Sequence, residues 1–183
     1  RVVTDLASTH PRMRALNHAS LSDPRVTVLS ADAMVYLAES KLDFDVVILD
    51  FPDPNNYSVG KLYSAELYKS DRARLSRDGV LAVQATSPLF ARKSYWCIVH
   101  TLRSVGLSVV PYRVFVPSFG VWGFALARHE PFEPPTELPP GESRYLDAET
   151  LRSLFDLAPD MREVETTVNR LDNQALVGYY TGE

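Results

Sequence analysis

Apolar runs alternate with helix-like patterns along the first two thirds of the chain. The most continuous run, residues 44–50 (Phe-Asp-Val-Val-Ile-Leu-Asp), predicts a strand buried on both faces of a parallel sheet. Shorter strands are predicted at 26–29, 79–85, 107–116 and 121–127, and helices after Pro11 and at 34–37, 62–75 and 91–105. This order predicts an α/β domain with a mostly parallel sheet and a C-terminal antiparallel hairpin.

The last third of the chain has a different pattern. Residues 129–143 are rich in proline and glutamate, which predicts an extended linker between a domain at 1–128 and a tail at 144–183. Within the tail, a helix is predicted at 148–157. The run Gln-Ala-Leu-Val-Gly-Tyr-Tyr at 174–180 predicts a final strand that packs back on the domain.

Composition narrows the class of protein. The chain has 183 residues, 45% of them hydrophobic and 23% charged, which is typical of a globular domain. The net charge of −4 and the lack of an extended Lys/Arg cluster do not favour nucleic-acid binding, whereas a small cationic substrate suits this balance. The single cysteine excludes an internal disulfide, and the four histidines lack metal-ligand spacing. No apolar run reaches the roughly 20 residues of a membrane span.

Asp50 and Asp53 are the strongest candidates for chemistry. Ligands of parallel sheets bind beyond the carboxyl ends of the strands, and Asp50 directly follows the predicted strand. Two carboxylates held by Pro52 and Pro54 form a concentrated negative site that can hold a cation or accept a proton. The alternative is a solvated turn, because Asp and Pro are common turn residues.

Several motifs, in order, resemble the spermidine synthase family of polyamine aminopropyltransferases. The most specific is Asp-Phe-Pro-Asp-Pro-Asn-Asn at 50–56 with the helix residues at 61–68, which resembles the family's catalytic loop. Asp32-Ala33, Gln84 and residues 112–124 also match. Asn-Arg-Leu-Asp-Asn-Gln at 169–174 resembles the branch whose catalytic domain follows a membrane-spanning region. The resemblance implies the Rossmann-like fold of adenosylmethionine-dependent transferases.

The family resemblance also implies a reaction and a set of roles. The reaction is aminopropyl transfer from decarboxylated S-adenosylmethionine, a co-substrate, to putrescine or a related small cationic amine, with no metal or other cofactor. The products are spermidine and methylthioadenosine. Asp50 is the implied catalytic residue, Asp32 and Ala33 bind the nucleoside, and the implied substrate-binding residues are Asp50, Asp53, Tyr57, Gln84 and Phe119.

Some of these residues have structural alternatives. Asp32 could cap the helix that follows it, Gln84 could bond a backbone group at the strand end, and Phe119 could pack in the core.

The chain also departs from the family pattern. It lacks the Gly-rich loop and the acidic residue of the first two family strands, which predicts a catalytic domain without its N-terminal Gly-rich part. Tyr57, Phe119 and Thr86 replace the usual Pro, Tyr and Glu, so the identity of the amine stays open. The resemblance further implies a homodimer and a cytoplasmic domain of a protein with upstream membrane segments.

Two other functions remain possible from the sequence. One is a methyltransferase of the same fold, although a methyl transfer does not need a pair of carboxylates for a dication. The other is a catalytically silent domain that binds a nucleoside or an amine.

Overall fold

The computed structural model describes residues 2–138, 140–141 and 143–183. The chain divides into two compact units, one ending at Tyr36 and the other running from Leu37 to Glu183, and each is described by itself.

The first unit is helical. It contains α1 (Val2–Thr9), α2 (Pro11–Leu16) and the short 3₁₀ helix η1 (Ser20–Ser22). Helix α2 begins at Pro11 as predicted, because the ring fixes φ near the helical value and the first turn does not need the missing N–H. The strand predicted at 26–29 is wrong: these residues have no regular structure, and no described strand pairs with their backbone.

Helix α3 (Ala33–Glu39) begins directly after Asp32. One Asp32 carboxylate oxygen accepts hydrogen bonds from the backbone N–H groups of Met34, at 2.9 Å, and Val35, at 3.3 Å. Asp32 is therefore the N-cap of this helix, the structural role that the sequence had left open for it.

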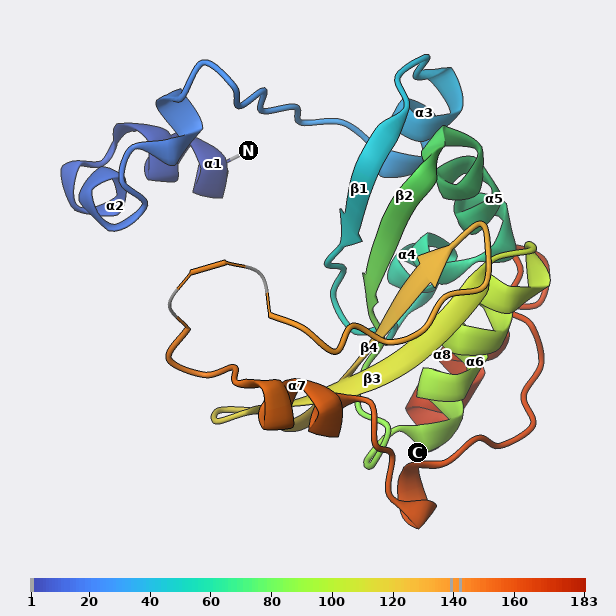
Figure 1. Ribbon diagram of the computed structural model, residues 1–183. Coiled ribbons are helices and arrows are strands. Elements are labelled where there is room, and N and C mark those ends of the chain that lie inside the picture. Colours follow the sequence, from blue (N-terminus) through green and yellow to red (C-terminus); the bar gives the residue numbers. More distant parts are fainter. Residues whose placement is uncertain (1, 139, 142) are drawn as a thin grey trace. The chain divides into compact units, whose positions relative to one another are not determined.

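The second unit is built on a mixed four-stranded sheet (Figure 1). Its strands are β1 (Phe44–Leu49), β2 (Leu75–Gln84), β3 (Ser108–Val116) and β4 (Gly120–Arg128), in the order β1-β2-β4-β3. Strands β1 and β2 are parallel, whereas β4 is antiparallel to both β2 and β3. The predicted α/β architecture and its C-terminal antiparallel hairpin are confirmed. The prediction of a mostly parallel sheet is wrong for the described strands, because only one of their three pairings is parallel.

Strand β1 lies at the edge of this sheet. Val47 and Leu49 point to the core, but the side chains on the other face are exposed, Val46 at 63% and Ile48 at 72%. The prediction that this strand is buried on both faces is wrong for the described chain. Among the described residues, β1 has a strand partner on one side only.

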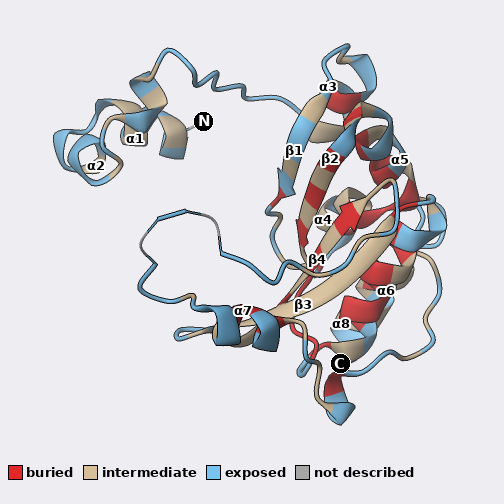
Figure 2. Cartoon of the chain, in the orientation of Figure 1, coloured by how far each residue is buried: buried red, intermediate tan, exposed pale blue. Residues whose placement is uncertain are grey.

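Helices α5, α6 and α8 cover one face of the sheet, and the buried residues concentrate there (Figure 2). The single helix predicted at 62–75 is divided into α4 (Tyr57–Gly60), the 3₁₀ helix η2 (Lys61–Tyr63) and α5 (Ala65–Arg74). The break is at Ser64, whose hydroxyl accepts a hydrogen bond from the Leu67 N–H and caps α5. Helix α6 (Arg92–Ser104) forms where it was predicted. The core has large, fully buried side chains at its centre: Tyr63, Leu67, Tyr68, Leu81, Tyr95, Ile98 and Leu102.

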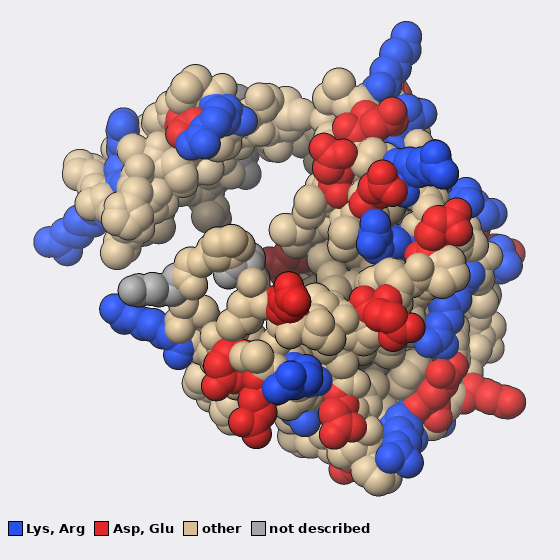
Figure 3. Space-filling view, in the orientation of Figure 1, with Lys and Arg blue, Asp and Glu red and all other residues tan. Residues whose placement is uncertain are grey.

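The other face of the sheet carries α7 (Ala148–Leu154). The Phe155 ring, directly after this helix, lies 5.4 Å from the Tyr112 ring of β3, and Tyr112 stacks on Phe124 of β4. The described residues of 129–143 form no helix or strand. On the face of the molecule in Figure 3, acidic and basic side chains are interspersed.

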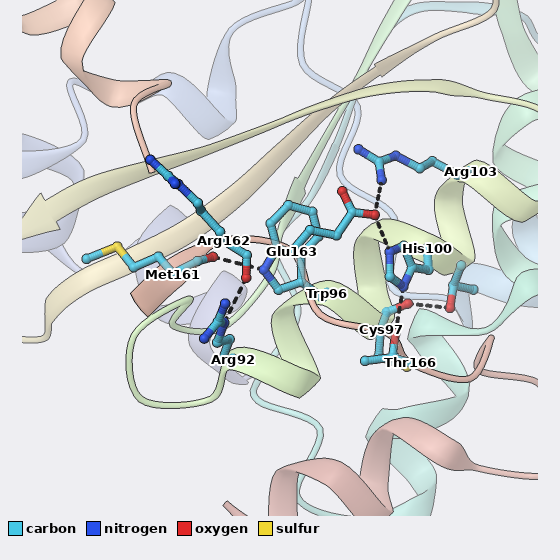
Figure 4. A network of polar contacts seen from close by, with 10 residues as sticks. Arg92, Trp96, Cys97, His100, Arg103, Met161, Arg162, Glu163 and Thr166 are labelled. Atoms are coloured by element: carbon cyan, nitrogen blue, oxygen red, sulfur yellow. Dashed lines mark hydrogen bonds and ion pairs between the residues drawn. The ribbon is translucent and has the colours of Figure 1, made fainter. Parts of the chain in front are cut away.

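The segment after α7 runs along α6 (Figure 4). The Trp96 indole donates to the carbonyl of Met161, at 2.9 Å, within the 3₁₀ helix η3 (Pro159–Met161). His100 contacts Thr166 and Glu163, each at 2.7 Å. Through these contacts residues 161–166 of the tail pack on α6.

The tail ends in helix α8 (Ala175–Gly182), not in the strand predicted at 174–180. The Asn173 side chain accepts a hydrogen bond from the Ala175 N–H, and the Asn169 side chain accepts one from the Leu176 N–H. These bonds satisfy two N–H groups that a helix start leaves without intrahelical partners. Leu176 is fully buried. No described helix has both the length and the apolar character needed to cross a membrane.

Candidate functional site

Asp50 and Gln84 lie close together because Asp50 directly follows β1, Gln84 is the last residue of β2, and these two neighbouring strands are parallel. Leu49 of β1 is paired with Val83 of β2, so the next residue of each strand lies at the same edge. In the orientation that satisfies both ends of the Gln84 amide, its N–H donates to Asp50 Oδ1, and its oxygen accepts from the Trp122 indole at 3.3 Å. Trp122 comes from β4, so three strands fix the Asp50 carboxylate.

The side chain of Tyr63 holds the backbone of the loop after Asp50. This buried side chain donates to the carbonyls of Phe51 and Pro52, each at 3.1 Å, and its ring meets the Phe51 ring edge-on. Burial and, secondarily, the charges of Asp53 and Asp50 raise the pKa of Tyr63 well above its ordinary value. Tyr63 therefore keeps its proton and remains a donor.

Asp53 is half-buried and has two different oxygen atoms. Oδ2 accepts a hydrogen bond of 2.7 Å from the Tyr180 hydroxyl of α8. Oδ1 is buried and has no hydrogen-bond partner among the described residues. Burial first, and the bond to Asp53 next, raise the pKa of Tyr180 to about 12, so this tyrosine is a protonated donor at neutral pH.

Three cavities adjoin these side chains. One of about 380 Å³ is lined by Asp50, Gln84, Tyr112 and Phe124, among others. A second, of about 270 Å³, shares Gln84 and adds Phe119 and Trp122. The third, also about 270 Å³, shares Trp122 and includes Asp53, Thr86, Tyr180 and Glu183. Shared lining residues thus place the three cavities next to one another, with Asp50 at one of them and Asp53 at another.

The structure brings together four of the residues selected from the sequence: Asp50, Asp53, Gln84 and Phe119. Phe119 is largely exposed, with its ring 5.5 Å from the Trp122 ring. Tyr57 is not among the residues that line the three cavities, and its hydroxyl donates to the Leu171 carbonyl at 3.2 Å. Asp32 and Ala33 belong to the first unit.

Sequence reasoning missed Tyr180, which it assigned to a strand at 174–180, and Glu183, which follows that segment. The spacing of Leu176, Tyr179 and Tyr180 was an available signal for a helix, since residues three and four apart share one helical face. No group of three or more His, Cys, Asp or Glu side chains within the described ranges is arranged to hold a metal ion.

The arrangement suits a small cation. Two carboxylates supply negative charge, and the faces of Phe119 and Trp122 can stabilise a positive charge by cation–π contact. The geometry also leaves one oxygen of Asp50 without the Gln84 bond, where it can accept a proton or a hydrogen bond from a ligand.

The fold is α/β and Rossmann-like. It is similar to a spermidine synthase crystallised with the transition-state analogue AdoDATO, with a TM-score of 0.70 and 23% identity over 86% of this chain and 55% of that one. Spermidine synthase from Thermotoga maritima is similar to the same extent, with a TM-score of 0.67 and 21% identity over 86% of this chain and 53% of the other.

Sequence comparison gives the family. Residues 8–134 match the spermine/spermidine synthase domain, and the chain belongs to this family. It is 45% identical to a polyamine aminopropyltransferase of Leptospira interrogans over 99% of this chain and 36% of that protein. It is 46% identical to polyamine aminopropyltransferase 2 of Ralstonia nicotianae over 97% of this chain and 35% of that protein. The chain thus spans about a third of the length of these relatives.

Proposed function

We propose that the protein carrying this chain transfers the aminopropyl group of decarboxylated S-adenosylmethionine to putrescine or a related small amine. The products would be spermidine, in the case of putrescine, and methylthioadenosine. The observation that carries the proposal is the Asp50 carboxylate, held by Gln84 at the end of β1 and next to the cavities that reach Asp53. Family membership and the names of the relatives support it.

The reaction needs a proton acceptor. The amine nitrogen attacks the propyl carbon beside the sulfonium, the carbon–sulfur bond breaks, and the sulfide leaves as neutral methylthioadenosine. An alkylamine has a pKa of about 10.4, so it arrives protonated at neutral pH and must lose its proton before it attacks. Asp50 accepts this proton through the oxygen that Gln84 does not hold, and passes it to water. No metal is required because the sulfide is a good leaving group.

The remaining residues bind the two substrates. Asp53 holds the amine, and Gln84, Phe119 and Trp122 line its path. Asp32 and Ala33 bind the adenine end of the nucleoside, a role that rests on the family resemblance and is compatible with Asp32 as a helix cap. Tyr57 as a substrate residue also rests on the resemblance alone, and its bond to Leu171 supports a role in fastening α4 to the tail.

Replacing the acceptor carboxylate tests this proposal. In the protein at its full natural length, with decarboxylated S-adenosylmethionine and putrescine, Asp50→Asn should lower the rate of methylthioadenosine release about 10²–10⁴-fold. Nucleoside binding should persist. Asp45→Asn is the matched control, since Asp45 also lies on β1 but is exposed and accepts a hydrogen bond from Ser76.

Two results would contradict the proposal. Methyl transfer from intact S-adenosylmethionine would identify a methyltransferase. If the folded protein binds its ligands but releases no methylthioadenosine with any of several amines, it is a binding domain.

We also propose that the complete protein belongs to the membrane-linked branch and acts as a homodimer, with this domain on the cytoplasmic side. The likeness of residues 169–174 to that branch supports the first point, and the location of polyamine synthesis supports the last. Fractionation of cells and light scattering of the purified protein test these statements.

A further inference from the structure

Two of the side chains around the cavity beside Asp53 have polar atoms that no described residue satisfies. Asp53 and Thr86 both line it, and each has a buried side-chain oxygen, Asp53 Oδ1 and Thr86 Oγ1, with no hydrogen-bond partner among the described residues. Buried polar atoms are nearly always paired, so two such atoms on one cavity indicate a ligand with hydrogen-bond donors.

Thr86 is held there in an unusual conformation. Its φ of +59° lies in the left-handed region, which a β-branched residue rarely adopts. The strain is maintained by β4, because the Gly123 N–H donates to the Thr86 carbonyl at 2.6 Å and a Cβ at residue 123 would meet that same carbonyl oxygen at 2.8 Å. Backbone strain of this kind persists where the surrounding structure enforces it, often at a ligand site.

The opposite wall of the cavity is helix α8, which lies outside the residues that match the family domain. The Tyr180 hydroxyl donates to Asp53 Oδ2, so Oδ1 is the oxygen of this carboxylate that has no hydrogen-bond partner among the described residues. Glu183 also lines the cavity, and its carboxylate accepts bonds from the Lys93 N–H at 2.6 Å and from Ser94. Glu183 thereby caps α6, whose own N-cap residue Ala91 has no capping side chain, and fastens the end of α8.

We propose that α8 completes the amine site: Tyr180 is a positioning residue that directs Asp53 Oδ1 toward the distal ammonium of a diamine, in a cavity that Glu183 also lines. An ammonium has three N–H donors and a positive charge, which match the free Asp53 oxygen, the Thr86 hydroxyl and the nearby carboxylate. This inference rests on the proposed function for the identity of the ligand. It adds that the tail of the chain selects diamines over monoamines.

Tyr180→Phe tests the inference in the protein at its full natural length. The substitution keeps the ring and removes the bond to Asp53. The KM for putrescine should rise about tenfold with little change in kcat, because a hydrogen bond to a charged group is lost. The KM for butylamine, which has no distal ammonium, and the KM for the nucleoside should not change.

Tyr179→Phe is the matched control. Tyr179 is on the same helix, and its hydroxyl accepts a bond from the Thr167 N–H instead of contacting the cavity. It should leave both amine constants unchanged. A purely structural role for Tyr180 would weaken putrescine, butylamine and the nucleoside together, and that result, or an unchanged KM for putrescine, would overturn the inference.

Calorimetry of putrescine binding separates this inference from the proposed function. Binding by the wild-type protein without turnover, weakened about tenfold by Tyr180→Phe, would reject aminopropyl transfer and keep the diamine site. Absence of diamine binding to the wild-type protein would overturn the inference itself.

Discussion

Gln84 of β2 links Trp122 of β4 to the carboxylate of Asp50. It binds Asp50 with its N–H and receives the Trp122 indole N–H on its oxygen. A side chain held at both ends has one orientation, and it presents the same donor to Asp50 throughout a reaction. The contribution of the Trp122 N–H therefore depends on the presence of Gln84.

A double-mutant cycle tests this dependence. Gln84→Met keeps the length of the side chain and removes its hydrogen bonds, and should lower kcat about tenfold. Trp122→Phe should lower it less, because the Gln84 bond to Asp50 survives. The double variant should be no slower than Gln84→Met alone, as measured by methylthioadenosine release. Effects that multiply would show that the two side chains act independently.

At the scale of elements, Asn169 joins α8 to α4 and η2, the helical segments that follow the loop with Asp53. This fully buried side chain donates to the carbonyls of Gly60 and Tyr63, at 3.0 and 3.1 Å, and accepts from the Leu176 N–H at 3.2 Å. Gly60 allows α8 to approach, since a Cβ there would collide with the Val177 side chain. The position of Tyr180 relative to Asp53 thus depends on one buried amide.

Asn169→Asp removes both donors at nearly constant volume and places a carboxylate against two carbonyls. The free energy of unfolding should fall by about 3 kcal/mol, because two buried acceptors lose their partners. Urea denaturation measures the change. The control is Asn173→Asp, an exposed residue whose acceptor contacts with Arg170 and Ala175 the substitution keeps. Equal losses in the two variants would show that burial of Asn169 is not the cause.

The elements that the sequence predicted well are those whose pattern is local. The strand at 44–50, the helix at 91–105 and the hairpin follow from continuous apolar runs, helical spacing and a short loop with Gly120, and the structure contains all three. Residues 26–29 and 174–180 have equally apolar runs, yet one forms no strand and the other forms a helix. The first segment has no strand partner among the described residues, and the second is capped by Asn173 and by Asn169, whose side chain is held by Gly60 and Tyr63. Strand pairing and the placement of Asn169 depend on contacts distant in sequence.

The site was predictable to the same extent. Asp50 and Gln84 could be placed together because both end parallel strands at one edge. The contact between Tyr180 and Asp53 joins residues 127 positions apart, and no local pattern indicates it.

At the scale of the whole molecule, one face of the sheet carries the main core, and a buried carboxyl group lies on the same side. Asp71 of α5 is 1% exposed, and neither carboxylate oxygen has a partner among the described residues. Burial raises its pKa from 3.8 to about 7. Below pH 4 the group is protonated in both the folded and the unfolded chain. Between about pH 4 and 7 the unfolded chain releases the proton while the folded one keeps it, so stability falls as the pH rises.

Asp71→Asn should therefore flatten the dependence of stability on pH. The three-unit shift corresponds to at most about 4 kcal/mol lost by the wild-type protein between pH 4 and 8. Because the asparagine amide also lacks partners, we expect the variant to be more stable than the wild type by about 2 kcal/mol at pH 8 and less stable at pH 4. Denaturation at both pH values measures this crossing, with exposed Asp78→Asn as the control. Parallel pH profiles for wild type and Asp71→Asn would mean that Asp71 is ionised in the folded chain and finds its counter-charge there.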